Sequence, residues 1–165
     1  MTESFAFDIN CGVKPRKFNG MKEQMEKLGL PTTIDYVEDD GGRSAVGYKS
    51  RVKNADDCVV RSISIALDLP YEQVFRELMY IGLEMGLYPS APQVYERYLK
   101  ENNWVKNRCP RDRNGKLIKL RDWISAPYRT VVLNSGHLTA IVNGKCRDTW
   151  DCTYRPVNSY WTPKP

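Results

Sequence analysis

The sequence predicts an α+β protein in which helices come first and an antiparallel sheet packs against them. Apolar residues recur at helical spacing through the middle of the chain, whereas short β-rich runs separated by turns dominate from about residue 128. Two of these runs are joined by Asn143-Gly144, the strongest short-range signal for a β-hairpin. Helices followed by strands, rather than alternating with them, are typical of the α+β class.

The length and composition are those of one folded domain. The chain has 165 residues, of which 41% are hydrophobic and 27% charged, and these are ordinary values for a globular protein. Every candidate catalytic residue follows the polar, glycine-containing stretch 38–43, which we expect to be an exposed loop. We therefore divide the molecule into an N-terminal accessory segment, residues 1–50, and a core, residues 51–165.

Charge and cysteine content indicate which partners and which cellular compartment suit the protein. The net charge of +5 is a mild bias that suits an acidic partner or a negatively charged surface. Five cysteines, an odd number without a CxxC pair, argue against a disulfide framework and favour a reducing compartment. The first residues have neither the basic flank nor the apolar stretch of a signal peptide, and no run approaches the ~20 apolar residues that cross a bilayer. We expect a soluble, cytoplasmic protein with no membrane contact.

The first fifty residues predict one helix and two short extended segments. Apolar residues recur at helical spacing over residues 15–28, and Gly29 with Pro31 ends that helix. Residues 5–9 alternate weakly between apolar and polar, and residues 32–37 follow the helix without its periodicity, so we expect both segments to be extended.

Three amphipathic helices are predicted next. The first covers residues 58–69, with Asp56 or Asp57 capping its first amides. The second begins at Pro70, and the third begins at residues 90–92, where Ser-Ala-Pro is a typical helix start. A basic, turn-like stretch and one helical turn then lead into the sheet. Its strands are expected at residues 128–133, 137–142, 145–150 and 158–161.

The only histidine, His137, opens one strand of the predicted hairpin. A two-residue turn fixes the register, so Asp148 lies on the same face of the sheet as a diagonal neighbour of His137, within reach of a carboxylate–imidazole hydrogen bond. The same alternation turns Asp151 to the opposite face. Trp150 faces His137 directly and would shield that hydrogen bond from water.

Cys58 stands at the start of the first core helix. The positive end of the helix dipole and the unpaired backbone amides there lower a thiol pKa, and Arg61, one turn further on, adds to this effect. The backbone N–H of Cys58 can stabilise an oxyanion, and Asn54 is the best side-chain donor just upstream. A thiol at a helix start, a histidine at a strand start and an acid on the paired strand are the parts of a nucleophilic thiol site. The candidate catalytic residues are therefore Cys58, His137 and Asp148.

The other cysteines predict no metal site. One histidine cannot build a multi-histidine site, and the spacing of Cys109, Cys146 and Cys152 matches no zinc pattern. Cys146 shares the His137 face and could compete as a nucleophile, but it lies within a strand and lacks a helix dipole. We expect neither a metal nor a cofactor.

These residues resemble the papain-like cysteine peptidase superfamily, over about residues 54–155. Its members carry Cys at a helix N-terminus, His at the start of a strand, and Asn or Asp on the next strand with a shielding Trp two residues later. Asp57-Cys58 also resembles the Asp-Cys of bacteriocin-processing peptidases, and the closest likeness is to small uncharacterised phage and bacterial proteins. The stretches that carry it are Asp57–Arg61, Pro70–Val74, Gly136-His137 and Asp148–Trp150.

The resemblance implies a papain-like fold and a cysteine hydrolase, a peptidase or isopeptidase that works through a thioester intermediate. Its substrate would be a protein or peptide, and a host protein in the host cytoplasm if a phage encodes the chain. Two other interpretations stay open: a peptidoglycan amidase or endopeptidase of similar chemistry, and a non-catalytic binding or inhibitor protein on a degenerate papain-like scaffold. A basic segment could also contact nucleic-acid phosphates. Its residues are Arg108, Arg111, Arg113, Lys116, Lys119 and Arg121.

Overall fold

The structure is a computed structural model that describes residues 19–46 and 57–165. The chain divides into two compact units, Met1–Pro31 and Thr32–Pro165. In the first unit the described residues form helix α1 (Asn19–Lys27), which is followed by Gly29 at a φ of +65°. This confirms the helix predicted over residues 15–28 from Asn19 onwards, while the segment expected at residues 5–9 lies outside the described residues.

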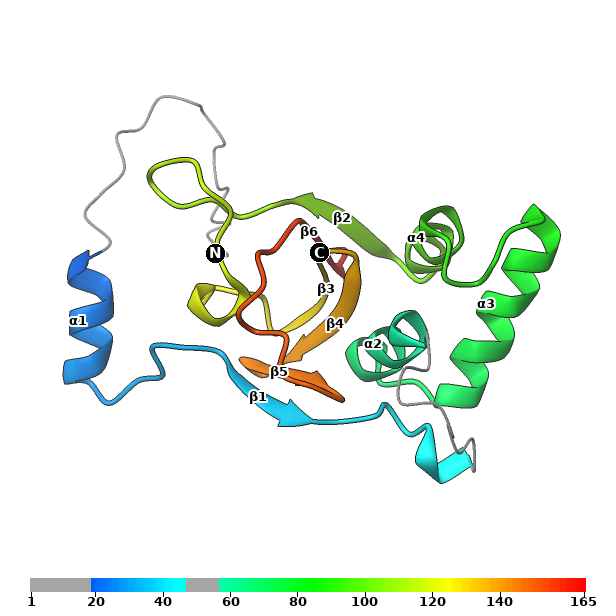
Figure 1. The fold of residues 1–165 in the computed structure, drawn as a ribbon, viewed down its shortest axis with the longest axis horizontal. Helices are drawn as coiled ribbons and strands as arrows, with labels where there is room; N and C mark the ends of the chain where they lie inside the picture. Colours follow the sequence, from blue (N-terminus) through cyan, green and yellow to red (C-terminus); the bar gives the residue numbers. More distant parts are fainter. Residues whose placement is uncertain (1–18, 47–56) are drawn as a thin grey trace, which may run out of the picture. The chain divides into compact units, whose positions relative to one another are not determined.

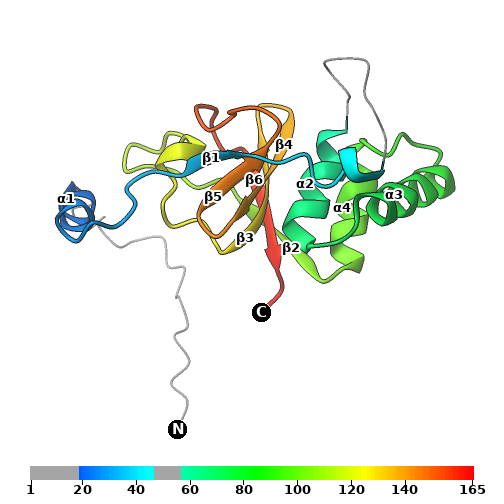
Figure 2. The ribbon, with the colours of Figure 1, turned by 90° about the horizontal axis from the view of Figure 1, so that it is seen from below.

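The second unit combines three helices with a six-stranded sheet, and this confirms the α+β class. The helices lie together on one side of the sheet (Figure 1, Figure 2). Their bounds are α2 (Cys58–Leu67), α3 (Tyr71–Met85) and α4 (Pro92–Glu101), and two short 3₁₀ helices are η1 (Ser44–Val46) and η2 (Leu120–Asp122). The strands are β1 (Asp35–Glu38), β2 (Trp104–Arg108), β3 (Arg129–Asn134), β4 (His137–Val142), β5 (Lys145–Asp148) and β6 (Ser159–Pro163).

The sheet is mixed, which corrects the prediction of an antiparallel sheet. Its strand order is β1-β5-β4-β3-β6-β2, and β1 runs parallel to β5 while the other neighbouring strands are antiparallel. Asp35 pairs with Lys145, far along the chain. A four-residue strand carries no sequence signal for a partner at that separation, so the pattern predicted its extension but not its place in the sheet. A second edge strand, β2, lies partly in the stretch predicted to be turn-like.

Because β1 pairs with β5, the core begins earlier in the sequence than predicted. The second compact unit begins at Thr32, well before the boundary predicted after residue 50. The residues that follow β1 continue onto the same unit, because the backbone N–H of Asp39 donates to the Asp148 carbonyl at 2.8 Å. Residues 38–43, predicted to be an exposed loop, instead begin on the sheet and reach α2.

Helix α2 is the central element of the core. Its apolar residues Val59, Ile63 and Ala66 are almost completely buried against the sheet and the other helices, as their spacing predicted. The polar side of the helix is buried as well, since Arg61 is only 5% exposed. A helix buried on all sides lies between layers rather than on the surface. The opposite face of the sheet is covered by η2 and by the chain after β5, which form a second apolar cluster with Cys146 and Cys152.

The hairpin of β4 and β5 has the predicted register. Ile141 pairs with Cys146, and Val142 pairs with Lys145 across the turn. Asn143 and Gly144 have φ values of 54° and 69°, and positive values at both positions are the mark of the type I′ turn that suits a two-residue hairpin. The turn therefore fixes which side chains of β5 share a face with His137.

Candidate active site

The predicted orienting acid lies against the histidine. The Nε2 atom of His137 is 2.7 Å from Oδ2 of Asp148, and Asp148 is only 2% exposed. Burial raises the pKa of the Asp148 carboxyl, but the hydrogen bond and charge of His137 outweigh this and hold it below its usual value. Burial lowers the pKa of His137, yet its hydrogen bonds to Asp148 and to the thiols of Cys152 and Cys58 raise it to about 11.

The thiol of Cys58 reaches the same imidazole. Cys58 is the first residue of α2 and is half-buried. Burial raises the pKa of this thiol, but the hydrogen bond with His137, a backbone hydrogen bond from Leu138 and the charges of His137 and Arg61 lower it below the ordinary value of 9.0. The structure thus brings the three predicted catalytic residues together.

Asp57 does not cap α2 with its side chain, which corrects one of the two predicted alternatives, while Asp56 lies outside the described residues. Among the described residues, its carboxylate makes no hydrogen bond to the first amides of the helix. It instead accepts hydrogen bonds from Arg61, from Arg43 at 3.1 Å and from the Tyr71 hydroxyl at 2.9 Å. Two cations and a phenol offer a carboxylate stronger partners than a helix amide does. The charge of Asp57 is therefore balanced and does not oppose thiolate formation at Cys58.

Trp150 lies against His137, as predicted, although it follows the end of β5. The centroid of its ring is 5.0 Å from that of His137, at an angle of 49° between the planes. The guanidinium of Arg155 lies over the Trp150 ring at 4.7 Å and braces it. The indole thus lies against the imidazole that binds Asp148. This is the position expected of a side chain that shields the hydrogen bond from water.

A second thiol lies at the same histidine, and the sequence did not predict it. Cys152 is completely buried, and its Sγ is 3.8 Å from Oδ2 of Asp148 and 3.8 Å from Sγ of Cys146. Within the described part of the chain, His137, Asp148 and Cys152 form a group of possible metal ligands whose donor atoms lie within 4.8 Å of one another. Two of these three groups, His137 and Asp148, are hydrogen-bonded directly to each other at 2.7 Å.

The buried thiols are poor nucleophiles despite their proximity. Cys146, predicted as a competing nucleophile, is completely buried, and its hydrogen bond with Cys152 raises its pKa. The same hydrogen bond lowers the pKa of Cys152, but that thiol is equally inaccessible. Cys58 combines a lowered pKa with contact to solvent, and it is the one of the three that a substrate can reach.

Of the two predicted oxyanion donors, the described residues include the backbone N–H of Cys58 but not Asn54. Cys58 occupies the first position of α2, where backbone N–H groups have no acceptor within the helix and remain available to an oxyanion. Asn54, the predicted side-chain donor, lies outside the described residues, as does Asp56. The role of Asn54 stays a prediction.

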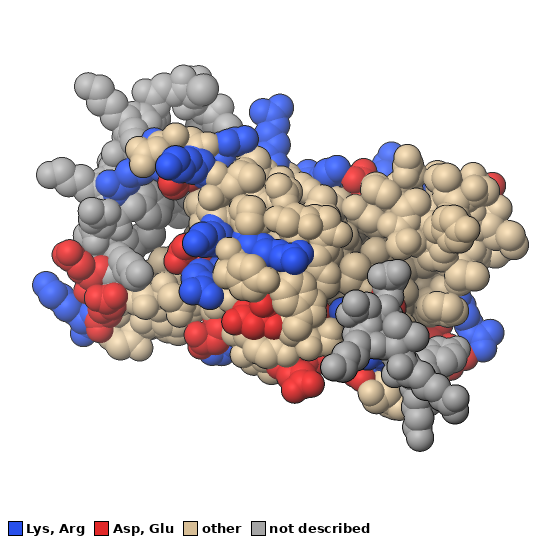
Figure 3. Space-filling model, viewed as in Figure 1, with Lys and Arg blue, Asp and Glu red and all other residues tan. Residues whose placement is uncertain are grey.

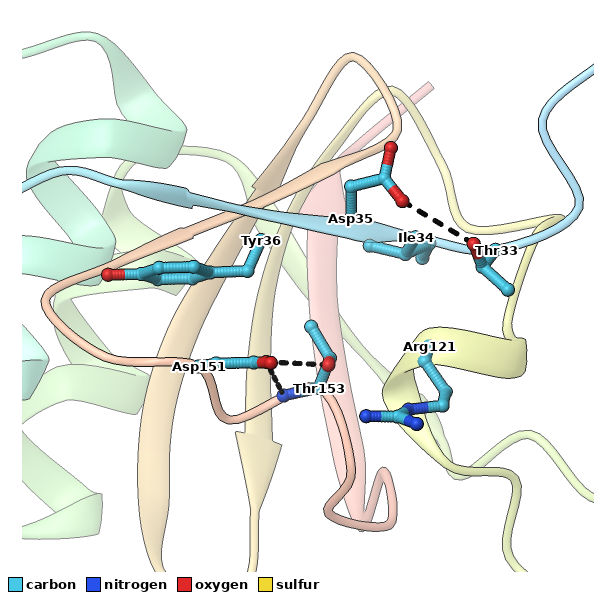
Figure 4. A pocket seen from close by; sticks show the side chains of 7 residues that line it. All are labelled: Thr33, Ile34, Asp35, Tyr36, Arg121, Asp151 and Thr153. Carbon is cyan, nitrogen blue, oxygen red and sulfur yellow. Dashed lines mark hydrogen bonds between the residues drawn. The ribbon is translucent and has the colours of Figure 1, made fainter.

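Asp151 belongs to a different pocket and lies beyond the end of β5, so the alternation that predicted its face does not extend to it. Its Oδ1 accepts hydrogen bonds from the backbone N–H and the hydroxyl of Thr153, at 3.0 and 2.6 Å. Figure 4 shows both side chains in a cavity of about 240 Å³, with the Arg121 guanidinium at the same pocket. The other lining residues are Thr33, Ile34, Asp35 and Tyr36. The pocket carries charges of both signs and holds none of the three candidate catalytic residues.

The predicted basic segment does not form a continuous basic surface in Figure 3. Lys and Arg side chains lie over this part of the molecule, and Asp and Glu side chains lie among and beside them. Arg111 donates to the Gly115 carbonyl at 2.6 Å, within its own loop. This mixed surface gives no specific support to nucleic-acid binding.

Comparisons with known proteins assign no family. No protein-family model, no curated protein and no solved structure matches the chain. Among the helices of the described residues, none combines the length and the apolar character that crossing a membrane requires. The functional argument therefore rests on the geometry around His137.

Proposed function

We propose that the protein is a cysteine hydrolase with Cys58 as nucleophile, His137 as general base and acid, and Asp148 as the residue that orients the imidazole. The observation that carries this proposal is the shared imidazole. His137 binds Asp148 through Nε2 at 2.7 Å, and it also holds the half-buried Cys58 thiol, whose pKa is lowered. A nucleophile, a base and an orienting acid in this order form the template of covalent acyl transfer.

The pKa shifts favour a preformed ion pair. The pKa of His137 is raised to about 11, and that of Cys58 lies below 9.0. Between these two values the proton resides on the imidazole and the sulfur carries the negative charge. In that range the nucleophile is the thiolate, the reactive form of cysteine, and the lowered pKa of Cys58 extends this range below that of an ordinary thiol.

The proposed reaction cleaves an amide bond in two steps. The Cys58 thiolate attacks the carbonyl carbon and forms a carbon–sulfur bond, while the backbone N–H of Cys58 and the predicted donor Asn54 stabilise the oxyanion. Imidazolium His137 then gives its proton to the departing amine as the carbon–nitrogen bond breaks, which leaves a thioester. His137 next takes a proton from water, the hydroxide attacks the thioester, and the products are a carboxylic acid and free Cys58. Asp148 stays ionised throughout and holds the Nε2 side of the ring.

The arrangement of these residues supports a papain-like scaffold. A thiol at the start of a helix, a histidine at the start of β4 and an acid at the end of β5 follow the order of that superfamily. The parallel strand β1 at the edge of the sheet is an addition to the predicted arrangement. We propose a peptide or isopeptide bond of a cytoplasmic protein as the substrate, and a host protein if the chain is phage-encoded.

Alkylation of the cysteines tests the activated thiol directly. At about pH 6 an ordinary thiol, with a pKa of about 8.5, is almost fully protonated, so we expect iodoacetamide to modify Cys58 roughly tenfold faster than Cys109 or more. Cys109 is the internal control, since it is half-buried like Cys58 and far from His137 in the sequence. Mass spectrometry of the peptides gives both rates from one sample. His137→Ala should remove the difference, and Cys58→Ala should remove the fast modification.

Equal rates at Cys58 and Cys109, or a fast rate that survives His137→Ala, would contradict the proposal. Cleavage assays then separate the kinds of hydrolase. Release of amines from peptide and isopeptide substrates, lost in Cys58→Ala, is the expected result. Activity on purified cell wall alone would favour the peptidoglycan amidase instead.

A further inference from the structure

A chain of alternating charges runs beneath the proposed site. Its members, in order of contact, are Arg43, Asp57, Arg61, Asp148 and His137. Arg43 and Asp57 are 3.1 Å apart, and Asp57 also pairs with Arg61. On its other side Arg61 donates from Nη2 to Oδ1 of Asp148 at 3.1 Å. The last contact is the 2.7 Å bond between Asp148 and His137.

Arg61 is the centre of this chain and has little contact with water. The side chain of Arg61 is 6% exposed, and the side chains of Asp57 and Asp148 are 12% and 2% exposed. A buried ion pair is a poor device for stability, because removing two charges from water costs about as much as their attraction returns. It does fix geometry, because a guanidinium presents its donors in a rigid plane.

The two oxygens of Asp148 have separate partners. Oδ2 faces His137, whereas Oδ1 accepts from Arg61 and from the backbone N–H of Thr149 at 2.7 Å. A carboxylate held at one oxygen cannot rotate freely about its terminal bond. Arg61 and Thr149 therefore determine where Oδ2 points, and it points at the imidazole.

Arg61 also joins the two halves of the proposed site. It lies on α2, three positions after Cys58, while Asp148 ends β5. Asp57, directly before the thiol, holds the other side of the guanidinium. One side chain thus ties the helix that carries the nucleophile to the strand that carries the acid.

We propose that Arg61 is a positioning residue of the hydrolase: by bridging Asp57 and Asp148 it sets the Asp148 carboxylate against His137 and holds the start of α2 at the hairpin. This inference rests on the proposed function. It assigns Arg61 no contact with substrate.

The single histidine of the chain makes the test unambiguous. An imidazole N–H bonded to a carboxylate gives a downfield proton signal by NMR, and only His137 can give it. We expect Arg61→Met to weaken or abolish this signal and to slow alkylation of Cys58 at about pH 6 roughly tenfold, the usual scale for loss of a partner that orients a reacting group. Arg61→Lys should restore part of the rate, because an ammonium reaches one carboxylate but not both.

Arg147→Met is the matched control. Arg147 lies on β5 next to Asp148 and pairs with Asp39 at 3.2 Å, so the variant removes an arginine ion pair from the same strand. It should leave both the imidazole signal and the Cys58 rate at their wild-type values. Equal losses in Arg61→Met and Arg147→Met would overturn the inference, since the effect would then be general to the sheet.

The double variant Asp57→Asn with Arg61→Met guards against misfolding, because it leaves no unpaired charge at Asp57. Circular dichroism checks that it is folded, and it should show the same loss of signal and rate as Arg61→Met. A wild-type signal and rate in this folded double variant would overturn the role of Arg61 and leave the proposed function intact. If Cys58 of the wild type reacts no faster than Cys109, the proposed function itself fails, whatever Arg61 does.

Discussion

At the scale of single residues, the indole of Trp150 limits the access of water to the hydrogen bond between His137 and Asp148. The ring packs 5.0 Å from the imidazole, and Arg155 holds it from above. An interaction between charges weakens when water enters, because water screens it far more than protein does. The value of this residue to the site lies in exclusion of water rather than in chemistry of its own.

Trp150→Ala should let water reach the imidazole N–H that faces Asp148. We expect exchange of that proton with solvent to become roughly tenfold faster, the change that about 1.4 kcal/mol of lost protection gives. Proton NMR of the single histidine signal measures the exchange. Trp150→Phe keeps an aromatic ring over His137 and is the control. The same exchange rate in all three proteins would show that Trp150 shields nothing.

The sequence was sufficient for some of these residues and not for others. Asp148 could be placed beside His137 because a two-residue turn leaves one register, and the register gives the face of each side chain within β5. Cys152 was missed because it follows the end of β5, where alternation no longer applies. The contact of Arg61 with Asp148 joins residues 87 positions apart, and no local pattern records it.

At the scale of elements, residues 39–43, which follow β1, are a structural part of the site. Asp39 bonds the backbone of Asp148, and Arg43 pairs with Asp57. Between them Gly41 packs on the backbone of Arg61, so closely that an added Cβ would lie 3.1 Å from its Cα and carbonyl oxygen. The glycine-rich composition that predicted an exposed loop reflects this close approach to α2 instead.

Gly41→Ala should therefore disturb more than the backbone. Its φ of +66° disfavours a side chain by about 1–2 kcal/mol, and the contact with Arg61 adds to that loss. Gly115→Ala is the control, because Gly115 has a φ of +76° and, among the described residues, nothing within 4 Å of an added Cβ. Urea denaturation should show the larger loss of stability for Gly41→Ala, and only this variant should slow Cys58 alkylation. Equal losses in both would contradict the packing argument.

Helices and strands differ in how far the sequence predicts them. The apolar spacing of Val59, Ile63 and Ala66 defines a helix face by itself, and the structure confirms α2, α3 and α4 within a few residues. A strand makes its backbone hydrogen bonds with a neighbouring strand. The positions of β1 and β2 in the sheet therefore could not be predicted from their own four or five residues.

At the scale of the whole molecule, the raised pKa of His137 makes stability depend on pH. Unfolded, His137 loses its proton near its ordinary value of 6.5 and Cys58 near 9.0; folded, the pKa of His137 is about 11 and that of Cys58 is lowered. Above 9 only the folded state keeps a proton, and stability must fall as pH rises toward 11.

We expect the unfolding free energy of the wild type to fall by up to about 1.4 kcal/mol per pH unit from this pair between pH 9 and 11. Denaturant titrations at a series of pH values measure it. His137→Gln lacks the group and should show a smaller slope, while the buried tyrosines, whose pKa values are also raised, contribute to both proteins alike. Parallel curves for the two proteins would contradict the raised pKa of His137.

The long separation between α2 and the hairpin has a consequence for biosynthesis. Translation delivers Cys58 early, whereas His137 and Asp148 arrive near the end, and β1 must wait for β5 across 110 positions. Contacts this distant form only after the intervening chain exists. The Cys58 sulfhydryl therefore lacks its contacts with His137 and Leu138 as it leaves the ribosome, and in the proposed hydrolase it becomes the nucleophile only when the last third of the protein has been made.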